Sequence, residues 1–177
     1  IIKKKQDILM KKKIALVLLS TVLIIGIAAG CTDKQEDMAA LKADNTENTV
    51  DVIGIGDIEE ELGVAILVPA SVTDETCQVS DGSTGIIRFT AGDADYVYYV
   101  QAGDEAVDAT GMAAALPNQG TFLVDNATYE MAYEDGGAGI AYWYDKTNQV
   151  SCTLVLETTS DPTLLRATAE SFIAVQN

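Results

Sequence analysis

The chain has 177 residues, of which 11 are Lys or Arg, 27 are Asp or Glu and none is His, so its formal net charge is −16. This length fits one domain, and a composition that is 48% hydrophobic and 21% charged is that of a folded chain. The absence of His excludes Ser–His and Cys–His catalysis and imidazole metal sites, and the acidic balance argues against nucleic acid, because phosphate binding needs clustered Lys and Arg.

The segment 10–31, which reads MKKKIALVLLSTVLIIGIAAGC, has the form of an export signal. Three lysines at 11–13 precede an uncharged run of sixteen residues at 14–29. Positive residues stay on the cytoplasmic side, and such a run is short for a spanning helix of about 20 residues but typical of a signal-peptide core. The run ends in the small residues Ala28, Ala29 and Gly30, directly before Cys31, and a signal peptidase needs small side chains there.

The sequence Ala28-Ala29-Gly30-Cys31 resembles the bacterial lipobox, usually written Leu-Ala-Gly-Cys, and departs from it at Ala28. The resemblance implies that the Cys31 thiol receives diacylglycerol and that the chain is cut between Gly30 and Cys31. It also implies that acyl chains such as palmitate anchor the protein in the cell membrane, facing outside the cytoplasm. The alternatives are an uncleaved N-terminal anchor, or an ordinary secretory signal with Cys31 a bystander. We expect residues 1–9, which precede Met10, to be a non-native extension of the signal peptide 10–30.

Processing would make the chain still more acidic. Removal of residues 1–30 takes away six of the 11 basic residues and one of the 27 acidic ones, leaving 5 and 26 and a net charge of −21. Anionic lipids repel such a surface, so a covalent lipid is a suitable membrane attachment. The segment 31–51 is polar and lacks aromatic residues, and we expect a flexible tether there, ahead of a folded domain at 52–177.

The domain has the pattern of an α+β fold with a single antiparallel meander sheet of about six strands, covered by a C-terminal helix. A short N-terminal helix is expected at 57–63, capped by Asp57 and stopped by Gly63. The apolar run 64–68, which ends before Pro69, is expected to be a buried strand. The meander strands are expected, with turn residues between them, at 76–79, 85–90, 96–101, 129–133, 139–144 and 150–157.

The last expected element is a helix that begins at Pro162 with Asp161 as its N-cap. Apolar residues recur at helical spacing along it, and we expect that face to pack across the sheet. These residues are Leu165, Ala169, Phe172 and Ile173. In the strand 139–144, the alternation of residues predicts one buried face and one aromatic-rich, half-exposed face.

Several short segments resemble a domain of unknown function common in Gram-positive bacterial lipoproteins. They are Glu60-Glu61-Leu62-Gly63 before 64–69, Tyr96-Val97-Tyr98-Tyr99, Asp108-Ala109-Thr110-Gly111-Met112, and Ala141-Tyr142-Trp143 with the closing helix. Members of that family often read Asp-Ile-Ser-Gly at 108–111 and often carry Arg in place of Tyr99. The resemblance covers roughly residues 53–176 and implies an extracytoplasmic antiparallel sheet with a helix across it, akin to the lipoprotein-carrier fold. It implies no reaction.

Two cysteines lie in expected strands of the domain, Cys77 and Cys152. An exported chain meets an oxidising or thiol-poor compartment, so a disulfide that closes a loop of 76 residues is one interpretation. Two buried free thiols that behave as small apolar residues are the other.

Other candidate chemistry is weak. Acidic residues gather at 93/95, 104/105/108 and 134/135, but none has the ordered spacing of a calcium loop, so we expect turn residues and no metal site. A carboxylate-dependent hydrolase needs two carboxyl groups about 5–9 Å apart, and the strand acids Glu130 and Glu157 have no supporting motif.

Six aromatic residues line either a ligand groove or the core and its cross-strand pairs: Tyr96, Tyr98, Tyr99, Tyr142, Trp143 and Tyr144.

Together these observations favour a membrane-anchored lipoprotein whose domain is a non-catalytic binding or interaction module at the cell envelope, without a cofactor. Its expected partners are the membrane, through the lipid on Cys31, and an envelope protein or small ligand. The alternatives are a carrier of a hydrophobic ligand and an envelope hydrolase. A filled core would favour the interaction module, an enclosed apolar cavity the carrier, and converging carboxylates the hydrolase.

Overall fold

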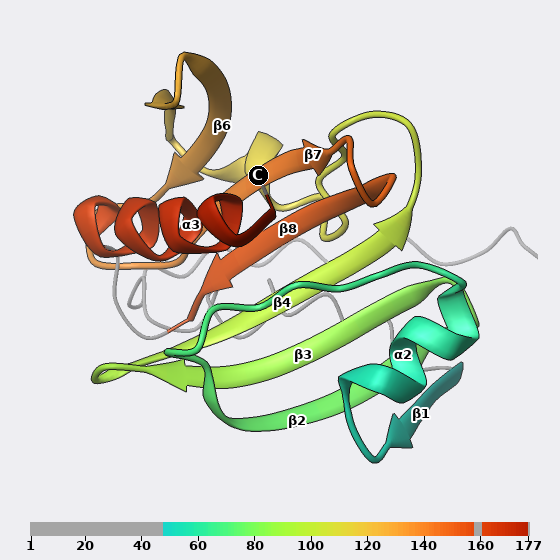
Figure 1. Ribbon diagram of the computed structural model, residues 1–177. Coiled ribbons are helices and arrows are strands. Elements are labelled where there is room, and N and C mark those ends of the chain that lie inside the picture. The colour runs from blue at the N-terminus through green and yellow to red at the C-terminus, as the bar shows by residue number, and fades with distance from the viewer. Residues whose placement is uncertain (1–47, 158–160, 177) are drawn as a thin grey trace, which may run out of the picture. The chain divides into compact units, whose positions relative to one another are not determined.

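The computed structural model describes residues 48–157 and 161–176, which form an α+β domain around one antiparallel sheet (Figure 1). The eight strands are β1 (Thr49–Val52), β2 (Thr73–Ser80), β3 (Thr84–Ala91), β4 (Ala94–Ala102), β5 (Asn118–Val124), β6 (Ala127–Tyr133), β7 (Gly139–Asp145) and β8 (Val150–Leu156). The helices are α2 (Ile55–Leu62) and α3 (Pro162–Gln176), and η3 (Ala113–Ala115) is a single 3₁₀ turn. The segments expected to be the signal peptide (10–30) and the lipobox (28–31) lie outside the described residues.

The strand order is β1-β2-β3-β4-β8-β7-β6-β5, with every neighbouring pair antiparallel. Two four-stranded meanders therefore meet where β4 pairs with β8, and the segment 103–117 carries the chain from the middle of the sheet to its far edge. The hairpin turns hold residues with positive φ, including Asp125 at 47° and Asn126 at 67°. Asn and Asp tolerate this conformation, which matches the twist of the flanking strands.

Both helices lie on the same side of the sheet (Figure 1). Helix α2 packs on β2 and β3, and α3 packs on β7 and β8. Aromatic rings fill the centre of this layer, where the ring centroid of Phe172 lies 4.6 Å from that of Tyr98 and 5.5 Å from that of Phe89. Phe172 and Tyr98 have no exposed surface, so the core under the helices is filled.

The segment 103–117 covers part of the opposite face. It is held by side chains of β8 rather than by a backbone ladder, since the hydroxyls of Ser151 and Thr153 donate to the Val107 carbonyl at 3.1 and 3.0 Å. Two residues of the segment, Ala113 and Leu116, belong to a second, smaller apolar cluster on this face of the sheet. The sheet is therefore covered by helices on one side and partly by a connecting segment on the other.

The structure confirms the α+β class, the single antiparallel sheet and the C-terminal helix. Helix α3 begins at Pro162, and the Asp161 carboxylate accepts the Thr163 N–H at 2.8 Å, as an N-cap does. Helix α2 begins two residues earlier than expected, at Ile55, with Gly54 as its N-cap and Gly63 in the left-handed conformation at its end. Asp57 caps it from the first turn, by accepting the backbone N–H groups of Ile53 and Gly54.

The count of about six strands is wrong, because the sheet has eight. Strand β1 includes residues 49–51, which the sequence assigned to the tether, and its four residues are too few to show a clear alternation. Strand β5 follows a loop rich in Ala and Gly, which hid its first residues.

The expected strand at 64–68 does not form. Val64, Ile66 and Val68 pack on the helix-covered core, with Ile66 buried. The Ile66 N–H donates to the Glu59 carboxylate at 2.7 Å instead of to a neighbouring strand. Both sides of the inner strands are already paired, so this segment crosses the sheet face between the helices (Figure 1).

Candidate functional site

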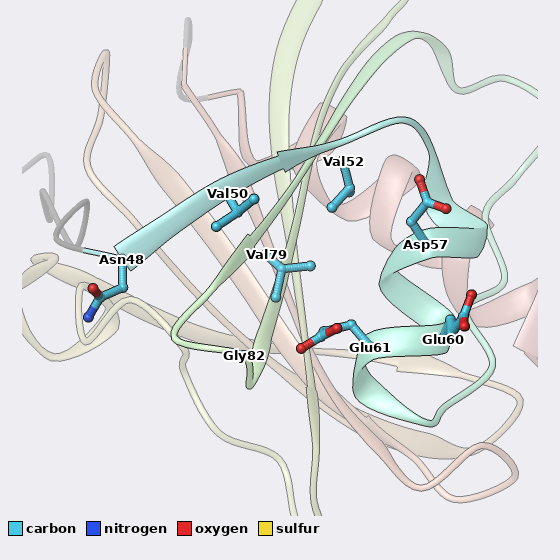
Figure 2. A pocket seen from close by; sticks show the side chains of 8 residues that line it. All are labelled: Asn48, Val50, Val52, Asp57, Glu60, Glu61, Val79 and Gly82. Atoms are coloured by element: carbon cyan, nitrogen blue, oxygen red, sulfur yellow. The ribbon is translucent and has the colours of Figure 1, made fainter.

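A groove of about 400 Å³ lies between β1, the turn that joins β2 to β3, and α2 (Figure 2). Its floor is apolar and consists of Val50 and Val52 of β1 and Val79 of β2. The register places Val50 directly opposite Val79, so their side chains share one face of the sheet. Val79 is buried, but Val50 at the edge of the sheet is 63% exposed. The groove thus presents apolar surface to solvent beside an edge strand.

Three carboxylates of α2 form the rim of this groove: Asp57, Glu60 and Glu61. They stand at i, i+3 and i+4, which places them on one face of the helix. Glu59, between them, faces elsewhere and bonds to the Ile66 N–H. The residues that line the groove include no Lys or Arg, so its rim is uniformly negative.

The seating of α2 depends on a glycine beneath it. A Cβ atom on Gly85 of β3 would overlap Ile58 Cγ2, and it would also lie 3.3 Å from Leu62 Cδ1. The absent side chain therefore lets the buried side of α2 approach the sheet, which holds the acidic side over the valines. At the other end of the groove, Gly82 has φ +61°, and its turn lies beside Glu61.

The face of the sheet that the helices leave uncovered carries a row of polar and aromatic side chains. In the register of the sheet, Tyr99, Thr153, Tyr142 and Glu130 follow one another across β4, β8, β7 and β6. The Tyr142 hydroxyl donates to the Glu130 carboxylate, and this bond, with partial burial, raises the pKa of Tyr142 to about 12. Burial likewise raises the pKa of Tyr99. Both phenols are neutral at physiological pH, so neither is an activated nucleophile or base.

The six aromatic residues do not line one groove. Tyr96, Tyr98 and Trp143 are buried under the helices, whereas Tyr99, Tyr142 and Tyr144 are half-buried on the other face. The core interpretation therefore holds for three of them, and the prediction of one half-exposed aromatic face on the strand 139–144 is confirmed.

The cysteine pair consists of two free, buried thiols. Strands β3 and β4 lie between Cys77 on β2 and Cys152 on β8, which separates the two by about 14 Å or more at a strand spacing of about 4.8 Å. A disulfide needs Cα atoms within about 7 Å, so the disulfide interpretation is wrong for this fold. Cys152 instead accepts a hydrogen bond from the Tyr98 hydroxyl at 3.0 Å, and burial raises its pKa to about 12.

Several of the acidic residues considered for chemistry have structural partners. Asp108 organises a turn, since one carboxylate oxygen accepts the Thr110 N–H at 2.9 Å and the other accepts the Ala113 N–H at 2.7 Å. Glu157 pairs with Arg88 at 3.5 Å. It lies about 16 Å from Glu130 by strand spacing and rise, well beyond the separation of a hydrolase pair. Within 48–157 and 161–176, no group of three or more potential metal ligands gathers.

The expected lipidation site Cys31 and the expected cleavage site after Gly30 lie outside the described residues. Over the part of the chain that is described, no helix is long and apolar enough to cross a membrane. The sequence matches no protein-family model, no curated protein and no solved structure. No sequence pattern predicted the groove. Glu60 and Glu61 entered the sequence analysis only as part of the segment 60–63 that carries the family resemblance.

Proposed function

We propose that this chain is a lipid-anchored bacterial lipoprotein whose domain is a non-catalytic binding module at the cell envelope, and that the groove between β1 and α2 binds a positively charged segment of its partner. The anchor rests on the lipobox at 28–31 and on the resemblance to lipoproteins of Gram-positive bacteria. The likeness to the lipoprotein-carrier fold belongs to the same proposal, supported by a sheet with helices on one face.

The observation that carries the proposed binding function is the pairing of a valine floor with a carboxylate rim in one groove. A Lys or Arg side chain suits both parts, because its methylene stem packs on apolar surface while its charged head reaches the rim. The whole chain, at a net charge of −16, adds a long-range attraction for cations. A basic partner at an acidic surface gains mainly in association rate and selectivity.

The alternatives have less support. A carrier needs an enclosed apolar cavity, whereas the space under the helices is filled by stacked and tilted rings of Phe89, Tyr96, Tyr98, Trp143 and Phe172. A hydrolase needs two carboxyl groups with distinct environments. The groove acids Glu60 and Glu61 are both exposed, and Asp57 is occupied as a helix cap.

The test is a titration of the full chain, followed by NMR, with a blocked peptide Thr-Val-Lys-Lys-Thr and its counterpart Thr-Val-Glu-Glu-Thr. We expect the basic peptide alone to bind and to shift the methyl signals of Val50, Val52 and Val79. The double variant Glu60→Gln/Glu61→Gln should bind about three- to tenfold more weakly, since each exposed ion pair contributes about 0.2–1 kcal/mol.

A double variant with the same charge change, Asp104→Asn/Glu105→Gln, is the matched control. Both residues are exposed on the segment that follows β4, and neither lines the groove. If the control weakens binding as much as the groove variant does, the attraction is a property of the net charge and the groove is not the site.

A further inference from the structure

The edge of the sheet beside the groove has backbone groups directed outward. The Asp81 N–H donates to the Asn48 carbonyl at 3.3 Å, and the register continues with Thr49 opposite Ser80. In an antiparallel ladder the residues that bond across the pair alternate with residues whose N–H and C=O point away. The backbone groups of Asp51 therefore point away from β2, toward solvent.

Side-chain contacts agree with this assignment. Residues of non-hydrogen-bonded pairs lie closer together, and there the side chains meet: Gln78 donates to the Asp51 carboxylate at 2.8 Å. Among the described residues, none bonds to the outward N–H and C=O of Asp51. The next outward N–H is that of Ile53, two residues further along the chain. It donates to the Asp57 carboxylate at 2.8 Å, so the open stretch of edge ends there.

Strand β1 is short and carries one charge, Asp51, but other features that usually protect an edge are absent from it. It holds no Lys, no Pro and no bulge, and both Val50 and the following Ile53 are exposed. The groove lies directly beside this strand, since Val50 and Val52 line it. An added strand would thus place every second side chain in the groove and the others beside Asp51.

We propose that β1 binds an extended basic peptide as an additional antiparallel strand, with the order apolar-basic-basic. This proposal rests on the proposed function of the groove and specifies the partner's conformation and sequence. The apolar residue lies opposite Val52, the first basic residue opposite Asp51, and the second basic residue opposite Val50. Side chains alternate between faces, so the second basic residue extends over the valine floor to Glu60 and Glu61, while the first forms a cross-strand pair with Asp51.

A second copy of this chain is a less suitable occupant. An antiparallel pair of two β1 edges would bring two acidic grooves together, and like charges placed opposite each other are destabilising. A peptide with two basic residues instead neutralises charge on both faces of the added strand.

The experiment uses the full chain and three forms of the Thr-Val-Lys-Lys-Thr probe: unmodified, N-methylated at the first Lys, and N-methylated at Val. The first Lys stands opposite Asp51, so its N–H faces β1, whereas the Val N–H faces away. We expect methylation at Lys to weaken binding about tenfold and methylation at Val to leave it within about twofold. Saturation with the unmodified peptide should slow hydrogen exchange of the Asp51 amide at least about tenfold.

Protein variants provide the complementary arm. Asp51→Pro removes the outward N–H, which edge strands tolerate, and Asp51→Asn removes only the charge. We expect Asp51→Pro to weaken binding more than Asp51→Asn does, with circular dichroism verifying that both fold. Should Asp51→Pro fail to fold, binding of the three peptide forms to the unmodified protein still tests the proposed strand addition.

The outcomes separate the two proposals. If the peptide binds with equal affinity in all three forms and the Asp51 amide exchanges as before, strand addition is wrong but the groove remains a binding site. If no form binds, both proposals fail. Protection of β5 amides instead of Asp51, or protection of Asp51 in a peptide-free dimer, also overturns the proposed strand addition.

Discussion

At the scale of single residues, the helix-covered core encloses a chain of hydrogen bonds between polar side chains. Trp143 Nε1 donates to the Gln176 side chain at 2.8 Å, Gln176 Nε2 donates to the Tyr98 hydroxyl at 3.1 Å, and that hydroxyl donates to Cys152 Sγ. Each polar atom of this chain has a partner, and an unmade bond here would cost about 1–3 kcal/mol. These hydrogen bonds also join the last residue of α3 to the centre of the sheet.

This environment predicts inert thiols. Burial raises the pKa of Cys152 to about 12 and also raises that of Cys77, so both remain protonated at pH 8, and thiols rather than thiolates react slowly. We expect iodoacetamide to label neither residue in the folded protein at pH 8 and both after unfolding in urea, as read by peptide mapping. A mass decrease of two hydrogens with a Cys77–Cys152 crosslinked peptide would contradict this.

At the scale of elements, the position of α2 decides whether the groove exists. Its buried face carries Ile58, which has no exposed surface, and an adjacent face, turned toward the groove, carries the rim acids. Gly85 lets the two layers meet, because a Cβ atom there would overlap Ile58. One strand glycine thus links core packing to the geometry of the proposed site.

We predict that Gly85→Ala lowers the free energy of unfolding by about 1–3 kcal/mol, the usual cost of overpacking a filled core, and weakens binding of the basic peptide as α2 shifts. Gly120→Ala is the matched control, since a Cβ atom there would lie 3.7 Å from Met131 Cγ, an ordinary contact. Urea unfolding followed by fluorescence of Trp143 measures both variants. Equal stability of the two variants would show that α2 adapts without cost.

At the scale of the whole molecule, the proposed arrangement is an acidic binding domain held at a membrane by a lipid. The sheet has two edges, and the groove lies at the edge nearest in sequence to the expected tether, since β1 is the first strand of the domain. Anchoring and folding are expected to be separable, because Cys31 precedes the first strand by 18 residues.

We predict that Cys31→Ala abolishes lipidation, so that the protein accumulates as a precursor or is cut elsewhere and released. The lipidated protein should partition into the detergent phase and resist a high-salt wash, because buried methylenes contribute about 0.8 kcal/mol each and are insensitive to salt. The thermal midpoint of the domain should be the same in both proteins. Processing and retention of the variant like the parent would contradict lipidation of Cys31.

Much of the fold was predictable because its signals are local. Asp161 and Pro162 indicated the start of α3, its apolar spacing indicated the buried face, and alternation together with turn residues located six of the eight strands. The turn pair Asp125-Asn126 after the short apolar run 122–124 was the signal that would have found β5. Strand β1 has no comparable signal, since four residues between polar neighbours suit a tether equally well.

The sequence by itself determined the fold class, the acidic character, the absence of imidazole chemistry and the expectation of a lipid anchor, since composition and short motifs carry these. Only the tertiary structure decided that β4 pairs with β8, that residues 64–68 cross the sheet face unpaired, and that two strands separate Cys77 from Cys152. It also decided the groove, because β1 and α2 supply valines and carboxylates that become one site only when Gly85 lets the helix lie on the sheet. Such pairings depend on the free energy of packing the whole domain, which no local pattern encodes.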